Sequence, residues 1–426
     1  MKLLFQMSTS VKKNATKVPP SLKVGMHVLG SARNDARVMR SATALQEAGF
    51  AVSIVDIEEK GNHPEVEEIH GIYVKHILMP SSFITTRFRK WALLKAGWIL
   101  ILGILKLLQT PSDIYHAHDA NALPASYIAA LLRRKPLIFD AHELPLAEIS
   151  IERSWLPAIL ARLLSHIVSY CKGVITVSLP IAQEISKRYH CSNVSLIRNI
   201  PSYRASKKSN RLREYLSISP NIRIALYQGY LDSNRGLANL IYAASFLEKD
   251  IIIVLMGNGI GATKSQIEAL IESEGVADRV KIIPYAPYAE LLDWTASADL
   301  GLIVYTPDYS LNVKMCLPNK LFEFIMAGLP VLASQLDAVV DIIKTYEVGQ
   351  IVTSLAPADI GAAINTLVSD PIALARMHHN ALEAAKGDLC WERESQHLIE
   401  FYNYILELKE NGDKSEITSS PSAVRT

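Results

Sequence analysis

Short apolar runs alternate with longer amphipathic stretches along this chain, and that alternation limits its fold more than any other feature. From Val24 onward, strand-like runs are followed by helical patterns such as Asp35 to Ala48 and Ala122 to Leu132. The strand-like runs of the first half are VGMHVLG, AVSIVDI, DIYHAH, PLIFDAH, GVITVS and VSLIRN. Strands that alternate with helices predict a parallel sheet covered by helices on both faces.

The same pattern restarts after the polar stretch PSYRASKKSNRLREYLSISPN, which indicates a second domain. Its strand-like runs are IRIALYQG, DIIIVLMG, RVKIIPY, DLGLIVY, PVLAS and GQIVTS. We therefore predict an α/β protein of two tandem, doubly wound Rossmann-like domains that face a central cleft, the usual place for a ligand. The predicted division is a flexible extension at 1–21, a first domain at 22–205, a second domain at 206–388, a final helix at 389–410 that packs back toward the first domain, and a disordered tail at 411–426.

Composition narrows the class of protein and its partners. The chain has 426 residues, of which 49% are hydrophobic and 20% charged, and its formal net charge of +2 argues against a nucleic-acid partner. The four cysteines show neither metal-site nor CxxC spacing, which is typical of a reducing compartment. The N-terminal apolar run is too short for a signal peptide. We expect a cytoplasmic protein that can reach the inner face of the membrane.

One apolar stretch, WALLKAGWILILGILKLL from Trp91 to Leu108, raises the question of a membrane. Lys95 and Lys106 interrupt it, and the charge-free part between them is too short to span a bilayer. Two interpretations remain. The stretch is either a core helix with two lysines that reach out to solvent, or a helix that rests on the membrane surface beside the basic residues Arg87, Arg89 and Lys90.

Two polar clusters of the first half follow predicted strands, in DIYHAHDAN and LIFDAHELP. Polar residues at strand ends fall on the ligand side of a parallel sheet. We predict that His142 and Asp119 take part in catalysis and that His118 and Glu143 bind substrate. His116 lies on the same strand face as His118, so one of the two histidines can be a core residue. These spacings are unlike those of familiar zinc sites, and we predict no metal.

A loop-to-helix stretch near the start, GSARNDARVMRS, allows two interpretations. Its residues Arg33, Asn34 and Arg37 could face the cleft. Alternatively, Asp35 caps an ordinary helix.

The stretch CLPNKLFEFIMAGLPVLAS predicts a helix that begins at Pro318 or Asn319 and is followed by a buried strand. The free N–H groups near Lys320 and Leu321 suit an anion such as a diphosphate, and Lys320 adds a full charge. Glu323 is expected in the first turn, where a carboxylate can accept hydrogen bonds from two ribose hydroxyls. The alternative is that Glu323 only complements the helix dipole and Lys320 is solvated.

Two further strand–glycine turns support the same chemistry. In LYQGYLDSNRGLANLIYA, Gly229 ends a strand, and Arg235 opens a helix and could grip a phosphate with its forked guanidinium. In VLMGNGIG, the glycines at 257, 259 and 261 do not match the dinucleotide fingerprint but permit a close approach of backbone to a ligand. We predict that Gly229, Gly257 and Asn258 line the substrate site.

In order along the chain, the motifs DIYHAHD, DAHEL, GVITVS, LIRN, YQGYLDSNRG, LMGNG and LPNKLFEFIMAGLPVLAS resemble those of the GT-B fold glycosyltransferases of family four. This family comprises retaining, nucleotide-sugar-dependent enzymes of the bacterial polysaccharide type. The resemblance implies that the first domain binds the acceptor and the second binds the nucleotide sugar. It also implies that Glu323 holds the ribose and Arg235 the diphosphate, and it adds Asn199 of LIRN to the substrate-binding residues.

Two residues depart from the pattern of the family. Met315 stands where many relatives carry a Glu for the donor sugar, and Tyr230 stands where many carry an Arg after the glycine of YQG. The second change leaves less charge for the diphosphate, which Lys320 can supply.

We predict a retaining hexosyltransferase or a related enzyme that moves a sugar from a UDP-, GDP- or similar nucleotide sugar to a glycan or lipid-linked acceptor. The expected process is the biosynthesis of surface polysaccharide or glycolipid, without a cofactor and with peripheral contact to the membrane. The alternatives are a catalytically silent GT-B protein that binds or regulates a partner, and a nucleotide-sugar epimerase.

Overall fold

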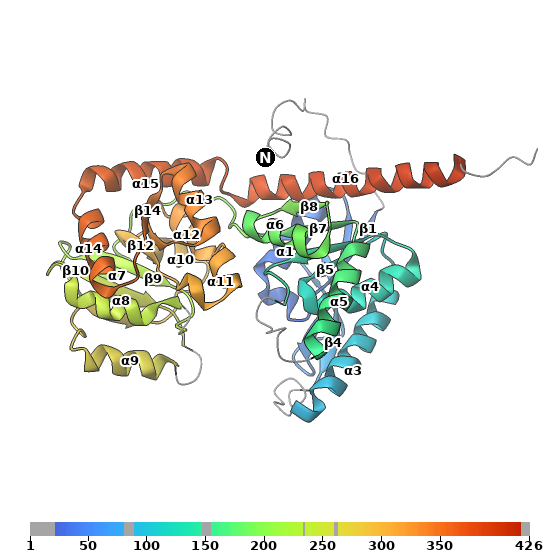
Figure 1. Ribbon diagram of the computed structural model, residues 1–426, viewed down its shortest axis with the longest axis horizontal. Coiled ribbons are helices and arrows are strands. Elements are labelled where there is room, and N and C mark those ends of the chain that lie inside the picture. Colours follow the sequence, from blue (N-terminus) through green and yellow to red (C-terminus); the bar gives the residue numbers. More distant parts are fainter. Residues whose placement is uncertain (1–21, 81–88, 147–154, 233–234, 260–262, 419–426) are drawn as a thin grey trace, which may run out of the picture. The chain divides into compact units, whose positions relative to one another are not determined.

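The computed structural model describes residues 22–80, 89–146, 155–232, 235–259 and 263–418 (Figure 1). The predicted extension at 1–21, the end of the predicted tail, Arg87 and Gly261 lie outside the described residues. By internal contacts the chain divides into one compact unit of residues 1–139 with 398–426 and another of residues 140–397. The predicted domain boundaries stay predictions.

The first sheet has eight strands in the order β3-β4-β2-β1-β5-β6-β7-β8, and the boundary between the units falls within β6. The pairs β1–β2, β1–β5, β2–β4 and β7–β8 are parallel, whereas β3–β4 is antiparallel. The strands are β1 (Lys23–His27), β2 (Ala51–Glu59), β3 (Val66–Ile69), β4 (Ile72–Met79), β5 (Ile114–His118), β6 (Leu137–Ala141), β7 (Gly173–Thr176) and β8 (Val194–Leu196).

The second sheet has six strands in the order β11-β10-β9-β12-β13-β14, and its neighbouring strands pair in parallel. All residues of β10 are buried, as expected for a central strand with helices on both faces. The strands are β9 (Arg223–Gln228), β10 (Ile251–Met256), β11 (Val280–Ile283), β12 (Leu300–Ile303), β13 (Val331–Ser334) and β14 (Gly349–Val352). The predicted α/β class with two parallel-sheet domains is confirmed.

Helices follow most strands and cover the sheets (Figure 1). In the first half they are η1 (Ala32–Asn34), α1 (Ala36–Glu47), α3 (Arg89–Leu108), α4 (Asp119–Arg133), α5 (Trp155–Tyr170), α6 (Leu179–Tyr189) and α7 (Arg211–Leu216). In the second half they are α8 (Leu237–Ala243), η4 (Ala244–Phe246), α9 (Thr263–Ser273), α10 (Leu291–Thr295), η5 (Pro307–Tyr309), α11 (Leu311–Met315), α12 (Asn319–Met326), α13 (Asp337–Tyr346), α14 (Pro357–Val368), α15 (Pro371–Lys386) and α16 (Trp391–Thr418).

The last helix, α16, runs to Thr418 and is thus longer than the predicted stretch that ends at 410. Near its start, the buried Glu394 accepts hydrogen bonds from the backbone N–H of Arg198 (2.6 Å) and from Arg198 Nε (2.8 Å). Farther along, the buried Tyr402 packs edge-on against Phe50 with ring centroids 5.5 Å apart. The residues of α16 from Leu398 onward belong to the same compact unit as β1 to β5.

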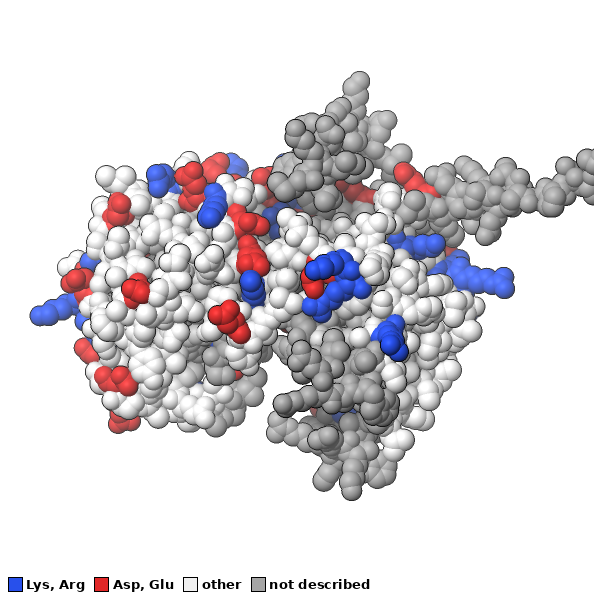
Figure 2. All heavy atoms as spheres, viewed as in Figure 1, with Lys and Arg blue, Asp and Glu red and all other residues white. Residues whose placement is uncertain are grey.

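Charged side chains of both signs lie singly or in small groups on the face shown in Figure 2, with uncharged residues between them. This distribution agrees with the small net charge. Within the part of the chain that the structure describes, none of the helices is apolar over a length sufficient to cross a membrane.

Candidate functional site

The loops that follow β9 and β12 meet at the start of α8, and a glycine permits the meeting. Gly236 has φ of +72°, and a Cβ at this position would lie 1.7 Å from the carbonyl oxygen of Val304. No side chain fits there, so the chain after β9 can press against the chain after β12. This packing fixes Arg235, the residue before Gly236, beside Tyr305.

Lys320, the second residue of α12, is 8% exposed, and its ammonium group points at aromatic rings. Its Nζ lies 3.5 Å from the ring centroid of Tyr227 and 5.2 Å from that of Tyr305. Among the described residues, no hydrogen-bond acceptor reaches Nζ. Burial, and then the charge of Arg235, hold the pKa of Lys320 well below its usual value, against the opposing effect of Glu323. The alternative of a solvated Lys320 is wrong.

Arg235 is the second cation at this place. Its Cζ lies 4.9 Å from the ring centroid of Tyr305, so both Arg235 and Lys320 stand against the same ring. Burial raises the pKa of Tyr305 to about 12, although Arg235 opposes that rise, so the ring is neutral near pH 7. Arg235 and a lysine that can take up a second positive charge stand around a neutral ring, and this arrangement favours an anion with two or more charges.

Glu323 lies on the same helix, in its second turn. The expectation of a place in the first turn is wrong, because α12 begins at Asn319 and has no acidic residue in its first turn. The carboxylate Oε2 accepts a hydrogen bond from Gln228 Nε2 at 2.5 Å, and Gln228 Oε1 accepts one from Thr295 Oγ1 at 2.8 Å. Glu323 is thereby held next to the end of β9.

The prediction of a free N–H at Leu321 is wrong. This N–H donates to the carbonyl oxygen of Pro318 at 3.0 Å, and the Leu321 side chain is fully buried. The helix start therefore offers less to an anion than its sequence indicated.

The glycine turn after β10 serves the packing of two loops. A Cβ at Gly257 would lie 1.8 Å from the carbonyl oxygen of Gly229, so the turn after β10 needs glycine to approach the turn after β9. Asn258 is exposed, and its carbonyl oxygen accepts a hydrogen bond from Leu231 N at 3.1 Å. A Cβ at Gly229 would lie 3.2 Å from Lys320 Nζ, so the turn after β9 passes over the ammonium group. Gly229 thus adjoins Lys320, whereas Gly257 and Asn258 support the Gly229 turn.

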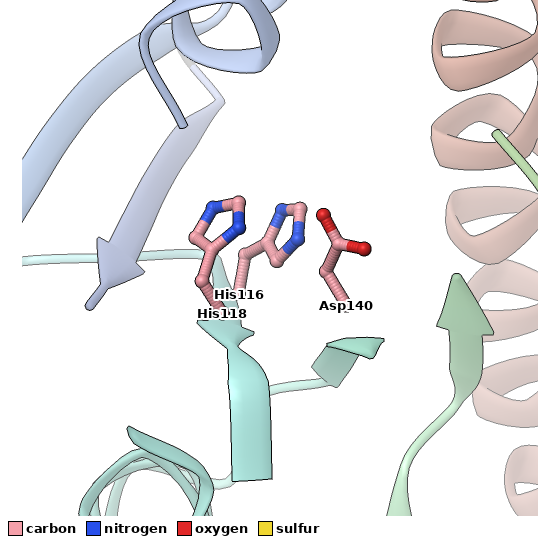
Figure 3. Close-up of side chains that lie close together, drawn as sticks. All are labelled: His116, His118 and Asp140. Atoms are coloured by element: carbon pink, nitrogen blue, oxygen red, sulfur yellow. The ribbon is translucent and has the colours of Figure 1, made fainter. Parts of the chain in front are cut away.

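In the first sheet, three buried side chains gather at the ends of β5 and β6 (Figure 3). The ring of His116 lies between that of His118 and the carboxylate of Asp140, and the two rings stack with centroids 4.3 Å apart at 18°. Tyr402 of α16 lies with its hydroxyl 2.7 Å from His116 Nδ1, so His116 is a core residue with a partner at this ring nitrogen.

Potential ligand atoms of these three residues lie within 4.8 Å of one another, close enough to consider a metal. Nearly parallel stacked rings direct their nitrogen lone pairs alongside each other, whereas a tetrahedral zinc site needs them to converge. The residues as placed do not fit such an ion, and the absence of a metal stays a prediction.

The remaining predicted residues of the first half lie after the strands. His142 Nε2 is 3.6 Å from Asp140 Oδ2, and Glu143 Oε2 accepts a hydrogen bond from Asn312 Nδ2 at 3.3 Å. Asp119 begins α4 with φ of +62°, a strained conformation for a residue with a side chain. Asn199 is half-buried after β8. Their roles stay predictions.

The loop before α1 has the structural role that one interpretation gave it. Asp35 caps the helix, since its Oδ1 accepts hydrogen bonds from the N–H groups of Arg37 (3.0 Å) and Val38 (3.1 Å). Arg33 pairs with Glu67 at 2.6 Å.

Comparison with known proteins identifies the family. Residues 36–200 match the family model described as Glycosyltransferase Family 4, and residues 209–384 match the model described as Glycosyl transferases group 1. The chain is a family-four glycosyltransferase of the GT-B type. The predicted family membership is confirmed.

Individual relatives of this glycosyltransferase are distant. It is 22% identical to a D-inositol 3-phosphate glycosyltransferase of Thermobispora bispora over 87% of this chain and 89% of that one. Sucrose-phosphate synthase of Thermosynechococcus elongatus has a similar structure, with a TM-score of 0.74, 16% identity, and coverage of 91% of this chain and all of that one. Anabaena HepE in complex with UDP-glucose gives a TM-score of 0.67 at 16% identity, with coverage of 90% of this chain and all of the other. At such identities the structures confirm the fold.

In this glycosyltransferase, the two residues that depart from the family pattern both take part in hydrogen bonds through their backbone carbonyl groups. Tyr230 is 66% exposed, and its carbonyl oxygen accepts a hydrogen bond from the Tyr227 hydroxyl at 2.6 Å. The carbonyl oxygen of Met315 accepts one from Ser178 Oγ at 2.9 Å.

Three site residues were missed from the sequence, namely Tyr227, Gln228 and Tyr305. Tyr227 and Gln228 are the last two residues of β9, which leads to a predicted site loop, and Tyr305 follows β12. Their place at the carboxyl ends of parallel strands is the signal that could have found them.

Proposed function

We propose that this glycosyltransferase moves a hexose or a related sugar from a nucleoside diphosphate sugar to a glycan or lipid-linked acceptor, with retention of the anomeric configuration. The observation that carries the proposal is the pair of basic side chains, Arg235 and Lys320, around the neutral ring of Tyr305. A diphosphate meets the need of this pair for a multiply charged anion. The structure of Anabaena HepE in complex with UDP-glucose supports a donor of this class.

The residues of the second sheet suit the departure of the diphosphate. As the bond from the sugar C1 to the phosphate oxygen breaks, negative charge grows on that oxygen, where Arg235 and Lys320 stabilise it. The acceptor hydroxyl bonds to C1 from the same face, and its proton passes to the phosphate oxygen that has left. Glu323 accepts hydrogen bonds from the ribose, while His142 and Asp119 position sugar or acceptor. No cofactor enters this scheme.

A screen of nucleoside diphosphate sugars by thermal shift tests the donor, because a ligand that binds only the folded state raises the melting temperature. The donor that stabilises the protein is then supplied with lipid-linked acceptors, and proton NMR follows the anomeric configuration of the product. We expect transfer with retention. An inverted product would overturn retention, and a product that stays on the nucleotide would indicate an epimerase.

Glu323→Ala should weaken the binding of the donor by about tenfold or more without unfolding the protein. A charge-assisted hydrogen bond contributes roughly 1.5–3 kcal/mol, and the ribose is expected to make two of them. Calorimetric titration measures the affinity, and Glu272→Ala on the exposed face of α9 is the matched control. Equal affinity of the Glu323 variant and the wild type would remove the ribose role.

We further propose that α3 makes a peripheral contact with an anionic membrane at the inner, cytoplasmic face. Leu94, Trp98, Ile101 and Leu105 form one stripe along α3 and are 65%, 53%, 50% and 49% exposed. The opposite side of α3 packs against α4, so α3 is only partly a core helix. An exposed apolar stripe of this kind on a surface helix suits the interface of a bilayer. The side chains of Arg89, Lys90 and Trp91 lie outside the described residues.

The double change Trp98→Ser and Ile101→Ser should lower co-sedimentation with anionic vesicles by several-fold, because it removes apolar area from the stripe. The control is Ile372→Ser on α15, which removes a residue that is 82% exposed elsewhere in the chain. Equal sedimentation of the double variant and the control would contradict the contact.

A further inference from the structure

The buried amino group of Lys320 lacks the partner that a lysine normally has in a protein interior. A buried charge is usually paired and hydrogen-bonded. Lys320 Nζ has two aromatic faces, and among the described residues it has no hydrogen-bond acceptor. Lys320 Nζ is therefore a buried donor without an acceptor, and it stands close to the second basic side chain, Arg235.

The charged and titratable neighbours of Lys320 give it little compensation. Arg235 repels it, and Glu323, which attracts it, shares its carboxylate with Gln228. Burial raises the pKa of Tyr305 and that of the Cys316 thiol to about 12, and burial also raises the pKa of Tyr227, so these three groups carry no charge near pH 7. The negative charge of the exposed Asp232, on the loop after β9, also raises the pKa of Tyr227.

We propose that Lys320 takes up a proton from solvent when the diphosphate of the donor binds. This inference rests on the proposed function. The arriving diphosphate supplies the hydrogen-bond acceptors that Nζ lacks, and its negative charges outweigh the repulsion from Arg235. In the complex Lys320 is an ammonium group, whereas in the free protein burial favours the neutral amine.

Tyr230, one of the two residues that differ from the family pattern, explains why donor binding is coupled to proton uptake in this chain. An arginine keeps its proton at every accessible pH, so a relative that uses arginine after the glycine of its YQG loop binds the donor without taking up a proton there. This chain has Tyr230 at that place and supplies its second cation from Lys320, which can lose its proton.

The affinity for the donor should fall as the pH rises through a defined range. Below the pKa of Lys320 in the free protein, the lysine is protonated before and after binding, and affinity is independent of pH. Between that pKa and the higher one in the complex, affinity falls by up to about tenfold for each unit of rising pH, because each binding event must take up one proton.

Calorimetric titration with UDP-glucose, GDP-mannose and ADP-glucose tests the coupling at one alkaline pH. Their diphosphate diesters do not titrate there, and each donor is measured in two buffers that differ in heat of ionisation. For the wild type we expect an apparent binding enthalpy that depends on the buffer and corresponds to uptake of up to about one proton. Lys314→Arg, a change at an exposed lysine of α11, should preserve this uptake.

Two variants isolate the lysine. Lys320→Arg keeps a permanent charge and should bind with little proton uptake, and Lys320→Met should bind at least about tenfold more weakly with no uptake. Binding with the same enthalpy in both buffers, or undiminished uptake in Lys320→Met, would overturn the coupling and leave the proposed function standing. Failure of the wild type to bind any of the three donors would overturn both.

Discussion

Replacing Arg235 by alanine should lower the turnover of the glycosyl transfer by about 10²–10³-fold, the range seen when one preorganised charge-stabilising donor is lost. The guanidinium is held against Tyr305 by the tight packing of Gly236, so it is in place before the reaction begins. Negative charge on the diphosphate is greater in the transition state than in the bound donor. The loss should therefore fall mainly on kcat and less on the affinity for the donor.

Steady-state kinetics with the best donor separate the two effects. Arg376→Ala on the exposed face of α15 controls for the loss of a positive charge far along the chain, and it should keep normal kinetics. Arg235→Lys should recover part of the turnover, since it restores the charge but not the forked geometry. A rise of KM with unchanged kcat would show that Arg235 contributes uniform binding and has no special role in the transition state.

The regular part of the fold could be predicted because its strands are buried on both faces. Runs such as that of β10 are apolar throughout and stand out from the sequence. The pair β3 and β4 was missed, because β3 alternates exposed and half-buried positions and carries Glu67 and Glu68, while the exposed Tyr73 and the half-buried Lys75 interrupt the buried residues of β4. β3 is the edge strand of this sheet and β4 lies next to it, and neither has the continuous apolar run by which the other strands were recognised.

The candidate site could be predicted only as far as the residues at strand and helix ends. The sequence places Arg235, Lys320 and Glu323 after β9 and on α12, where the structure has them. It could not predict the burial of Lys320, which depends on Tyr227 and Tyr305 from other strands. Nor could it pair His116 with Tyr402, which is 286 positions away. Local patterns predict elements, while the charge state of a side chain depends on what the fold packs against it.

Replacing Lys320 by methionine should make the protein more stable and nearly inactive. A buried lysine without a hydrogen-bond acceptor costs free energy in the folded state, because it must keep an unpaired charge or give up its proton, and an apolar side chain of similar length removes that cost. From the replacement of buried ionic groups by apolar ones, we expect the free energy of unfolding to rise by about 1–4 kcal/mol. Turnover should fall, since the diphosphate loses one of its two cations.

The pH dependence of this gain in stability shows whether it comes from removing an ionisable group or from better packing of the methionine side chain. Burial lowers the pKa of Lys320 in the folded state, so the wild type binds fewer protons folded than unfolded between the lowered pKa and the ordinary value near 10.4. Its stability relative to the methionine variant therefore rises with pH across that window, and the advantage of the variant shrinks.

Urea unfolding of both proteins at pH 7 and pH 9.5 measures this change in relative stability, with Lys314→Met as the exposed control. A variant that is less stable at both pH values would show that Lys320 is already stabilised in the free protein. An advantage that is the same at both would assign the gain to packing, because a cost of charge must diminish as the lysine loses its proton.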